Sequence, residues 1–278
     1  MTIRRLKMGL NTILDVKKEG YFIPYRYAET TPTLPSQEPY KGLFPLFQKR
    51  EGVFADCLRQ IAGYQEEFDT FGTQSPPEPR WEQDWFPRLD GAAAYTMVRS
   101  HKPKRIIEVG SGHSTRFMYR AIRDEGLNTT LSAIDPAPRA DITKLPVKID
   151  NRIVQETDLD IFSALEANDI LFIDSSHIAM PGTDVDYLFT NVLPTLPEGT
   201  IVHIHDIFLP DAYPAEWEWR GYNEQQAVVG FLSGGYDILF SSHYASKYMT
   251  DEISSQGLDN IPLQEGAFET SLWLQKKS

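Results

Sequence analysis

A series of short apolar runs, separated by stretches with a helical pattern, is the feature that most constrains the fold of this chain. From about Trp85 onward these runs lie at 105–109, 130–134, 152–154, 170–173, 200–204, 236–240 and 270–274. Strands that alternate with helices form doubly wound α/β sheets, and nearly continuous apolar runs are typical of strands buried on both faces. We therefore predict a Rossmann-like α/β fold with a seven-stranded sheet, in which the run at 152–154 is the weakest strand.

The spacing of the remaining apolar residues predicts helices and the direction of the last strand. Helical spacing favours helices at about 54–68, at 91–100 with Asp90 as the N-cap, and at 115–123. Between the last two apolar runs there is no strong signal for a full crossover helix. Parallel neighbours require such a crossover, so we predict that the last strand is antiparallel to the others.

The first 84 residues differ in texture from the rest of the chain. They are rich in proline, tyrosine and phenylalanine and show no alternation of strands and helices. Closely spaced prolines prevent long regular elements. We therefore predict two parts, an extension at 1–84 and a core at 85–278. The extension is expected to cap the ligand site of the core with aromatic residues from 1–84 and the adjoining 85–86, namely Tyr21, Phe22, Tyr25, Tyr27, Trp85 and Phe86.

Charge and cysteine content exclude several classes of partner. The formal net charge is −12 and no basic cluster forms a face for phosphates, so we expect no nucleic-acid partner. No apolar run approaches the roughly 18 residues that span a bilayer, which predicts no membrane partner. The single cysteine, Cys57, predicts a reducing, cytoplasmic location. A small molecule is the expected substrate, and a homo-oligomer is compatible with the sequence.

The run Glu108-Val109-Gly110-Ser111-Gly112 follows the first strand and precedes a helix. Glycines let the backbone approach a ligand closely, and the helix N-terminus offers free N–H groups. A dinucleotide fingerprint needs a third glycine at the position of Thr115, so the loop argues against NAD. A carboxylate at Glu108 suits the cationic, amino-bearing end of S-adenosylmethionine. Asp135 ends the second strand, where a carboxylate can accept both ribose hydroxyls.

An ordered set of four motifs resembles the class I S-adenosylmethionine-dependent methyltransferases. The set is Glu108 to Thr115, then Ile134 to Pro136, Phe172 to His177 and His205 to Pro210, within a similarity that covers about residues 80–277. More narrowly, it is similar to a bacterial subset with Gly-Ser-Gly-His-Ser-Thr and to metal-dependent O-methyltransferases of small molecules and sugars. The resemblance implies S-adenosylmethionine as methyl donor and cofactor contacts from Glu108, Gly110, Ser111, Gly112, His113, Ser114, Asp135 and Asp174.

Acidic and imidazole side chains follow two neighbouring strands of the predicted sheet. Asp174 ends the fourth strand and His205-Asp206 end the fifth, so they should meet beyond the carboxyl ends of the strands. Asp174, His205 and Asp206 are the predicted ligands of Mg²⁺ or another divalent cation. His177 is the predicted general base, because its reference pKa lies near neutrality, and Asp174 is the second predicted catalytic group.

Other interpretations of these residues stay open at the level of sequence. Asp135 before Pro136 could only form a turn, and the glycines could only close a tight turn. Each polar residue of the second cluster could only satisfy hydrogen bonds inside the protein. O-methylation of a small-molecule hydroxyl, such as that of a sugar, polyol or natural product, is the preferred function. The alternatives are an NAD(P)-dependent oxidoreductase and a methyltransferase fold that binds without catalysing.

Overall fold

The computed structural model describes residues 3–31, 38–138 and 142–277. The chain divides into two compact units, 1–35 and 36–278. The described part of the smaller unit holds helix α1 (Ile3–Ile13) and a 3₁₀ turn at Ala28–Thr30. Residues 36–84 fall within the larger unit, although the sequence pattern groups them with the extension. The predicted capping of the site by the tyrosines of the first unit stays a prediction.

The larger unit contains the seven-stranded sheet that the apolar runs predict. Its strands are β1 (Arg105–Val109), β2 (Thr130–Ile134), β3 (Lys148–Asp150), β4 (Ile170–Ile173), β5 (Ile201–Ile204), β6 (Tyr236–Ser241) and β7 (Leu272–Lys276). The order is β3-β2-β1-β4-β5-β7-β6, and β1 to β5 run parallel. β7 is antiparallel to both β5 and β6, which confirms the predicted direction of the last strand. β7 lies inside the sheet, and β6 forms the edge.

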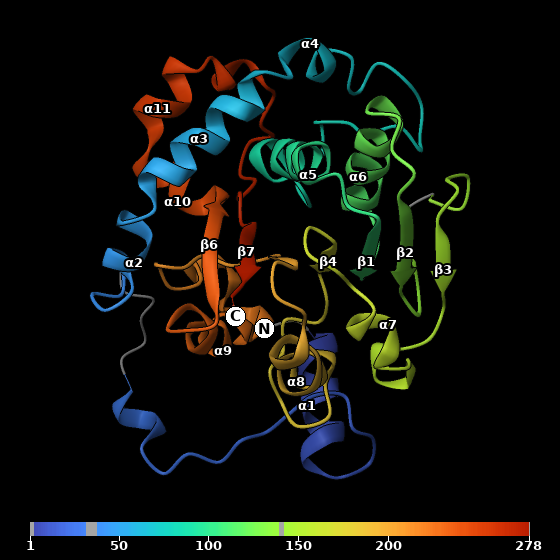
Figure 1. Ribbon diagram of the computed structural model, residues 1–278. Coiled ribbons are helices and arrows are strands. Elements are labelled where there is room, and N and C mark those ends of the chain that lie inside the picture. Colours follow the sequence, from blue (N-terminus) through green and yellow to red (C-terminus); the bar gives the residue numbers. More distant parts are fainter. Residues whose placement is uncertain (1–2, 32–37, 139–141, 278) are drawn as a thin grey trace. The chain divides into compact units, whose positions relative to one another are not determined.

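Helices cover both faces of this sheet (Figure 1). α3, α5 and α6 lie on one side, and α7, α8 and α9 lie on the other. The helices of the unit are α2 (Phe44–Gln48), α3 (Glu51–Ala62), α4 (Gln65–Phe68), α5 (Arg88–His101), α6 (His113–Asp124), α7 (Asp160–Ser163), α8 (Asp184–Tyr187), α9 (Glu224–Leu232), α10 (Ser242–Tyr248) and α11 (Thr250–Ser255). None of the described helices is long and apolar enough to pass through a membrane.

The central strands form the core because their side chains are apolar on both faces. All four residues of β4 are buried, as are all four of β5. His203 is the polar exception within β5. Its ring stacks on Phe172 with centroids 3.7 Å apart, and its Nε2 lies 2.8 Å from the hydroxyl of Ser271. His203 is therefore a packed and hydrogen-bonded residue of the core.

Three local predictions are wrong. The third strand lies at Lys148–Asp150, and Val154 instead begins a 3₁₀ turn. This edge strand is short and polar, so the apolar signal at 152–154 was misleading. The helix expected at 54–68 is interrupted at Gly63. Asp90 is not an N-cap, because α5 begins at Arg88 and the side chain of Asp90 is fully buried within its first turn.

Candidate active site

A cavity of about 1300 Å³ opens beyond the carboxyl ends of β1, β2, β4 and β5. This is the edge where ligands bind in open parallel sheets. The cavity wall includes all but one of the predicted cofactor, catalytic and metal residues: Gly110, Ser111, Gly112, His113, Ser114, Asp135, Asp174, His177, His205 and Asp206. The exception is Glu108. The wall also includes Trp85 and Phe86, which precede α5, and a segment that follows β5 at 217–222.

The glycine loop is held tightly against the end of β4. Gly110 has a φ of +84°, and a Cβ at this position would collide with the carbonyl oxygen of Asp174. A side chain is therefore excluded both by conformation and by space. Thr115 fixes the other end of the loop, because its hydroxyl accepts a hydrogen bond from the Gly112 N–H at 3.0 Å. The loop leads directly into the N-terminus of α6 at His113.

The carboxyl group of Glu108 lies behind this loop and is fully buried. The hydroxyls of Ser114 and Thr115 donate hydrogen bonds to its two oxygens at 2.6 and 2.7 Å. Burial raises the pKa of Glu108 to about 8, against the lowering effect of these two hydrogen bonds. The side chain thus anchors the first turn of α6, and its direct contact with a cofactor stays a prediction.

Asp135 faces the glycine loop from the end of β2. Its Oδ2 accepts hydrogen bonds from the backbone N–H of Ser111 at 2.9 Å and from the Ser111 hydroxyl at 2.6 Å. Its Oδ1 accepts one from the Ala137 N–H at 2.8 Å. The carboxylate is only half-buried and lines the cavity. Oδ1 therefore keeps capacity to accept from a ligand hydroxyl, whereas Ser111 already occupies both acceptor sites of Oδ2.

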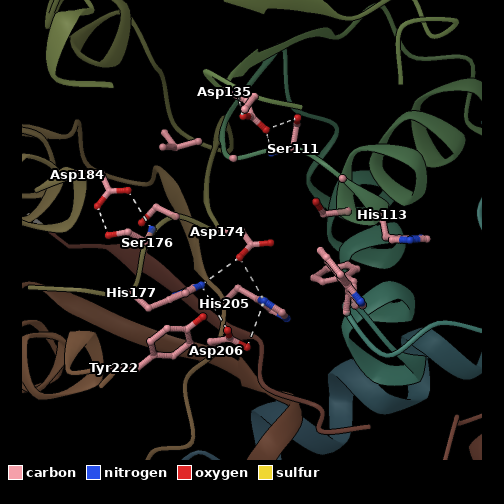
Figure 2. Close-up of a pocket in the computed structure, with 18 of the residues that line it drawn as sticks. Ser111, His113, Asp135, Asp174, Ser176, His177, Asp184, His205, Asp206 and Tyr222 are labelled. Carbon is pink, nitrogen blue, oxygen red and sulfur yellow. Dashed lines mark hydrogen bonds and ion pairs between the residues drawn. The ribbon is translucent and has the colours of Figure 1, made fainter. Parts of the chain in front are cut away.

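Four further polar side chains meet at the ends of β4 and β5 (Figure 2). His177 lies between two carboxylates, with its Nε2 3.4 Å from Asp174 and 3.3 Å from Asp206. The Nδ1 of His205 lies 3.5 Å from Asp174 and 3.6 Å from Asp206. The structure therefore brings together all four residues that the sequence singled out here. The side chain of Asp174 is 36% exposed, so it is the member of this polar cluster most open to the cavity.

Each imidazole of the polar cluster is held from behind by a buried carboxylate. The Nδ1 of His177 lies 2.8 Å from Oε2 of Glu224, the first residue of α9. The Nε2 of His205 lies 3.4 Å from Oδ2 of Asp90 in α5. Both carboxyl groups are fully buried and neither lines the cavity. They form two carboxylate–imidazole pairs that face the same two aspartates.

These surroundings determine the ionisation of the polar cluster. Burial would lower the pKa of His177, but hydrogen bonds to Asp174 and Glu224 outweigh it and hold the pKa well above its usual value. The pKa of His205 is likewise raised against burial, by the charges of Asp174 and Asp206. Burial opposes ionisation of Asp174, yet the two imidazoles hold its pKa below the usual range. A raised pKa favours the charged form of His177, and its role as general base stays a prediction.

Glu224 and Asp90 are the site residues that sequence reasoning missed. Both come from helices, at positions where an acidic residue ordinarily begins a helix. Asn223, which precedes Glu224, accepts a hydrogen bond from the N–H of Ala179 at 2.7 Å, and its own N–H donates to the carbonyl of His177. These bonds hold the start of α9 against the loop after β4, but they become visible only in three dimensions.

The predicted divalent-metal site does not fit this arrangement. Among residues 3–31, 38–138 and 142–277, no group of three or more histidine, cysteine, aspartate or glutamate side chains could hold a metal ion. The donors of Asp174, His205 and Asp206 are close to one another, but the two imidazoles lie 3.3–3.6 Å from Oδ1 of Asp174 and from both oxygens of Asp206, which are the atoms that a hard cation would need.

Comparison with known proteins identifies part of the chain as a methyltransferase domain. Residues 107–207 match the family model described as a methyltransferase domain. No curated protein matches the chain. Among solved structures, the chain is similar to the Podospora anserina methyltransferase PaMTH1 with bound S-adenosylhomocysteine, at 18% identity, covering 88% of this chain and 100% of that one with a TM-score of 0.43. The plantazolicin methyltransferase BpumL with S-adenosylhomocysteine is 16% identical, over 84% of this chain and 100% of that one, with a TM-score of 0.43. A CmcI structure is 15% identical, over 69% of this chain and 72% of that one, with a TM-score of 0.42.

The domain match covers both the glycine loop and the polar cluster, from β1 to the end of β5. This part of the chain is therefore similar to a methyltransferase domain and lies within a seven-stranded sheet of the Rossmann-like type.

Proposed function

We propose that this protein transfers the methyl group of S-adenosylmethionine to a hydroxyl oxygen of a small molecule. The observation that carries the proposal is the position of the glycine loop and Asp135 beside the polar cluster, all within one cavity. S-adenosylmethionine held by the loop would present its methyl group toward Asp174. The cavity volume of about 1300 Å³ exceeds the range of about 300–1,000 Å³ typical of a single small-molecule site, which leaves room for cofactor and acceptor together.

The cofactor half of this proposal assigns the ribose hydroxyls to Asp135. The amino-acid end of the cofactor then lies over Gly110 and Gly112, near the N-terminus of α6. Burial, together with the charges of Arg116 and Arg80, lowers the pKa of His113 at this end to about 4. A neutral His113 and a helix N-terminus form a suitable environment for the carboxylate of the cofactor.

The acceptor half of the proposal concerns the proton of the attacking hydroxyl. We assign its removal to Asp174 and His177 acting together, because Asp174 is the carboxylate most open to the cavity and His177 contacts it directly. The oxygen attacks the methyl carbon as its proton leaves, and the carbon–sulfur bond of the donor breaks. The raised pKa of His177 favours its charged form, and the imidazole has to release that proton before it can accept one from the acceptor.

Calorimetry with S-adenosylhomocysteine tests the cofactor half. Asp135→Ala removes a carboxylate that would receive ribose hydroxyls, and each such bond contributes about 1.5–3 kcal/mol. We expect affinity to fall by at least tenfold. Asp150→Ala is the matched control, because Asp150 ends the neighbouring strand and its side chain pairs with Arg152 outside the cavity. Equal affinities of the wild type and Asp135→Ala, or tighter binding of NAD than of S-adenosylhomocysteine, would contradict the assignment.

A further inference from the structure

The segment after β5 forms an aromatic wall of the cavity. Its 3₁₀ helix, η5 (Ala215–Arg220), carries Trp217 and Trp219, and Tyr222 follows two residues later. All three rings line the cavity. The Tyr222 ring also lies against the imidazole of His177, with centroids 4.6 Å apart. This wall is therefore continuous with the polar cluster at which methyl transfer is proposed.

The guanidinium of Arg220 is enclosed by these three rings. Its central carbon lies 4.0 Å from the ring centroid of Trp217, 5.3 Å from that of Tyr222 and 5.4 Å from that of Trp219. Cation–π contacts with a ring face hold a guanidinium without neutralising its charge. Arg220 thus presents a positioned, charged group to the cavity, which it lines.

The hydrogen-bonding capacity of Arg220 is mostly unused. A guanidinium has five N–H donors, and Nη1 of Arg220 donates a hydrogen bond to the Tyr222 hydroxyl at 3.1 Å. Its Nε is buried and has no partner. Within the described part of the chain, no carboxylate lies within 4.0 Å of Arg220, whereas the half-buried Arg99 and Arg120 each pair with two. The nearby Glu216 and Glu218 do not supply this partner.

We propose that Arg220 binds a carboxylate of the methyl acceptor, and that the acceptor is a small ring-bearing acid. A planar guanidinium recognises carboxylates through two parallel hydrogen bonds. Several carboxylates already line the cavity, among them Asp135, Asp174 and Asp206. A singly charged carboxylate is repelled less by them than a doubly charged phosphate. This inference rests on the proposed methyl transfer and adds the class of acceptor to it.

The contacts of Tyr222 set the size of this acceptor. The Tyr222 ring contacts the imidazole of His177, and its hydroxyl accepts a hydrogen bond from Arg220. The imidazole and the guanidinium are therefore separated by about the length of one tyrosine side chain. A molecule with one ring can therefore place a hydroxyl at the polar cluster and a carboxylate at Arg220. The faces of Trp217 and Trp219 offer the apolar contact that such a ring needs.

A pair of matched probes tests the proposal, 4-hydroxybenzoate and its uncharged analogue 4-hydroxybenzamide. Their binding is measured by calorimetry at neutral pH with saturating S-adenosylhomocysteine. We expect the wild type to bind the acid roughly tenfold or more tightly than the amide, as a charge-assisted bidentate contact implies. Arg220→Gln should remove this preference, and Arg220→Lys should keep part of it. Arg59→Gln, an exposed arginine of α3 outside the cavity, is the control and should behave as the wild type.

Binding of S-adenosylhomocysteine separates the failure of this inference from the failure of the proposed function. If the wild type does not bind S-adenosylhomocysteine, the proposed function itself fails. If it binds S-adenosylhomocysteine but not 4-hydroxybenzoate, or binds acid and amide equally, the inference is overturned. A preference for the acid that persists in Arg220→Gln, with unchanged thermal unfolding of that variant, also overturns it.

Discussion

Replacing Glu224 by glutamine tests whether the buried pair Glu224–His177 controls the polar cluster. Glu224 is fully buried, and its Oε2 lies 2.8 Å from Nδ1 of His177. Glutamine keeps an acceptor oxygen of the same shape but removes the charge. The imidazolium then loses a charge-assisted bond, for which about 1.5–3 kcal/mol is expected. Glu224→Ala should cost more, about 3–5 kcal/mol, because it leaves a buried charge without its partner.

The stability difference between the wild type and Glu224→Gln should depend on pH. The pKa of His177 is raised in the folded protein. Its stabilisation is therefore complete below the unfolded pKa of about 6.5 and is lost as the pH rises through the folded pKa. Glu224→Gln lowers that folded pKa. The free energy of unfolding should consequently differ most between wild type and variant near pH 6.5, and the difference should shrink toward alkaline pH.

Urea unfolding between pH 6.5 and 9.5 measures this difference, and the NMR titration of the His177 ring proton measures the pKa directly. Because Glu224 does not line the cavity, the affinity for S-adenosylhomocysteine should not change. Turnover should fall once an acceptor is identified, with Glu224→Asp retaining part of it, since a shorter carboxylate keeps the charge. A pH-independent loss of stability together with an unchanged His177 pKa would refute the reasoning.

Two further predictions concern the glycine loop and the metal. Burial raises the pKa of Glu108 to about 8, so the stability linked to this group is complete below pH 4.5 and is lost as the pH rises to about 8. Glu108→Gln stays uncharged, so above pH 8 it should be more stable than the wild type by at most about 5 kcal/mol in urea unfolding. An equal pH dependence of both proteins would disprove this. Because the cluster does not fit a metal, S-adenosylhomocysteine affinity and methyl transfer should survive EDTA. Loss of either in EDTA with recovery on adding Mg²⁺ would restore Asp174, His205 and Asp206 as ligands.

The sequence predicted the central sheet well because burial on both faces leaves a strong apolar signal. β1, β2 and β4 match their predicted ranges residue for residue. The edge strand β3 carries Lys148 and Asp150, so it lacked that signal. In the site, motifs next to strand ends could be located because the fold places strand ends together. Glu224 and Asp90 could not, since they come from helices whose packing the local pattern does not encode.

The charge balance of the polar cluster explains why His177, His205, Glu224 and Asp90 are buried although they are polar. The proposed reaction moves a methyl group from a cationic sulfonium to oxygen, so the positive charge on the donor disappears during transfer. A strongly negative site would stabilise the charged donor more than the transition state and would slow the step. In the polar cluster, the raised pKa values of His177 and His205 favour two cationic rings beside Asp174 and Asp206. The carboxylates that maintain this state, Glu224 and Asp90, lie behind the imidazoles and away from the cavity. The front of the site is thereby close to neutral while Asp174 stays ionised and available to the acceptor.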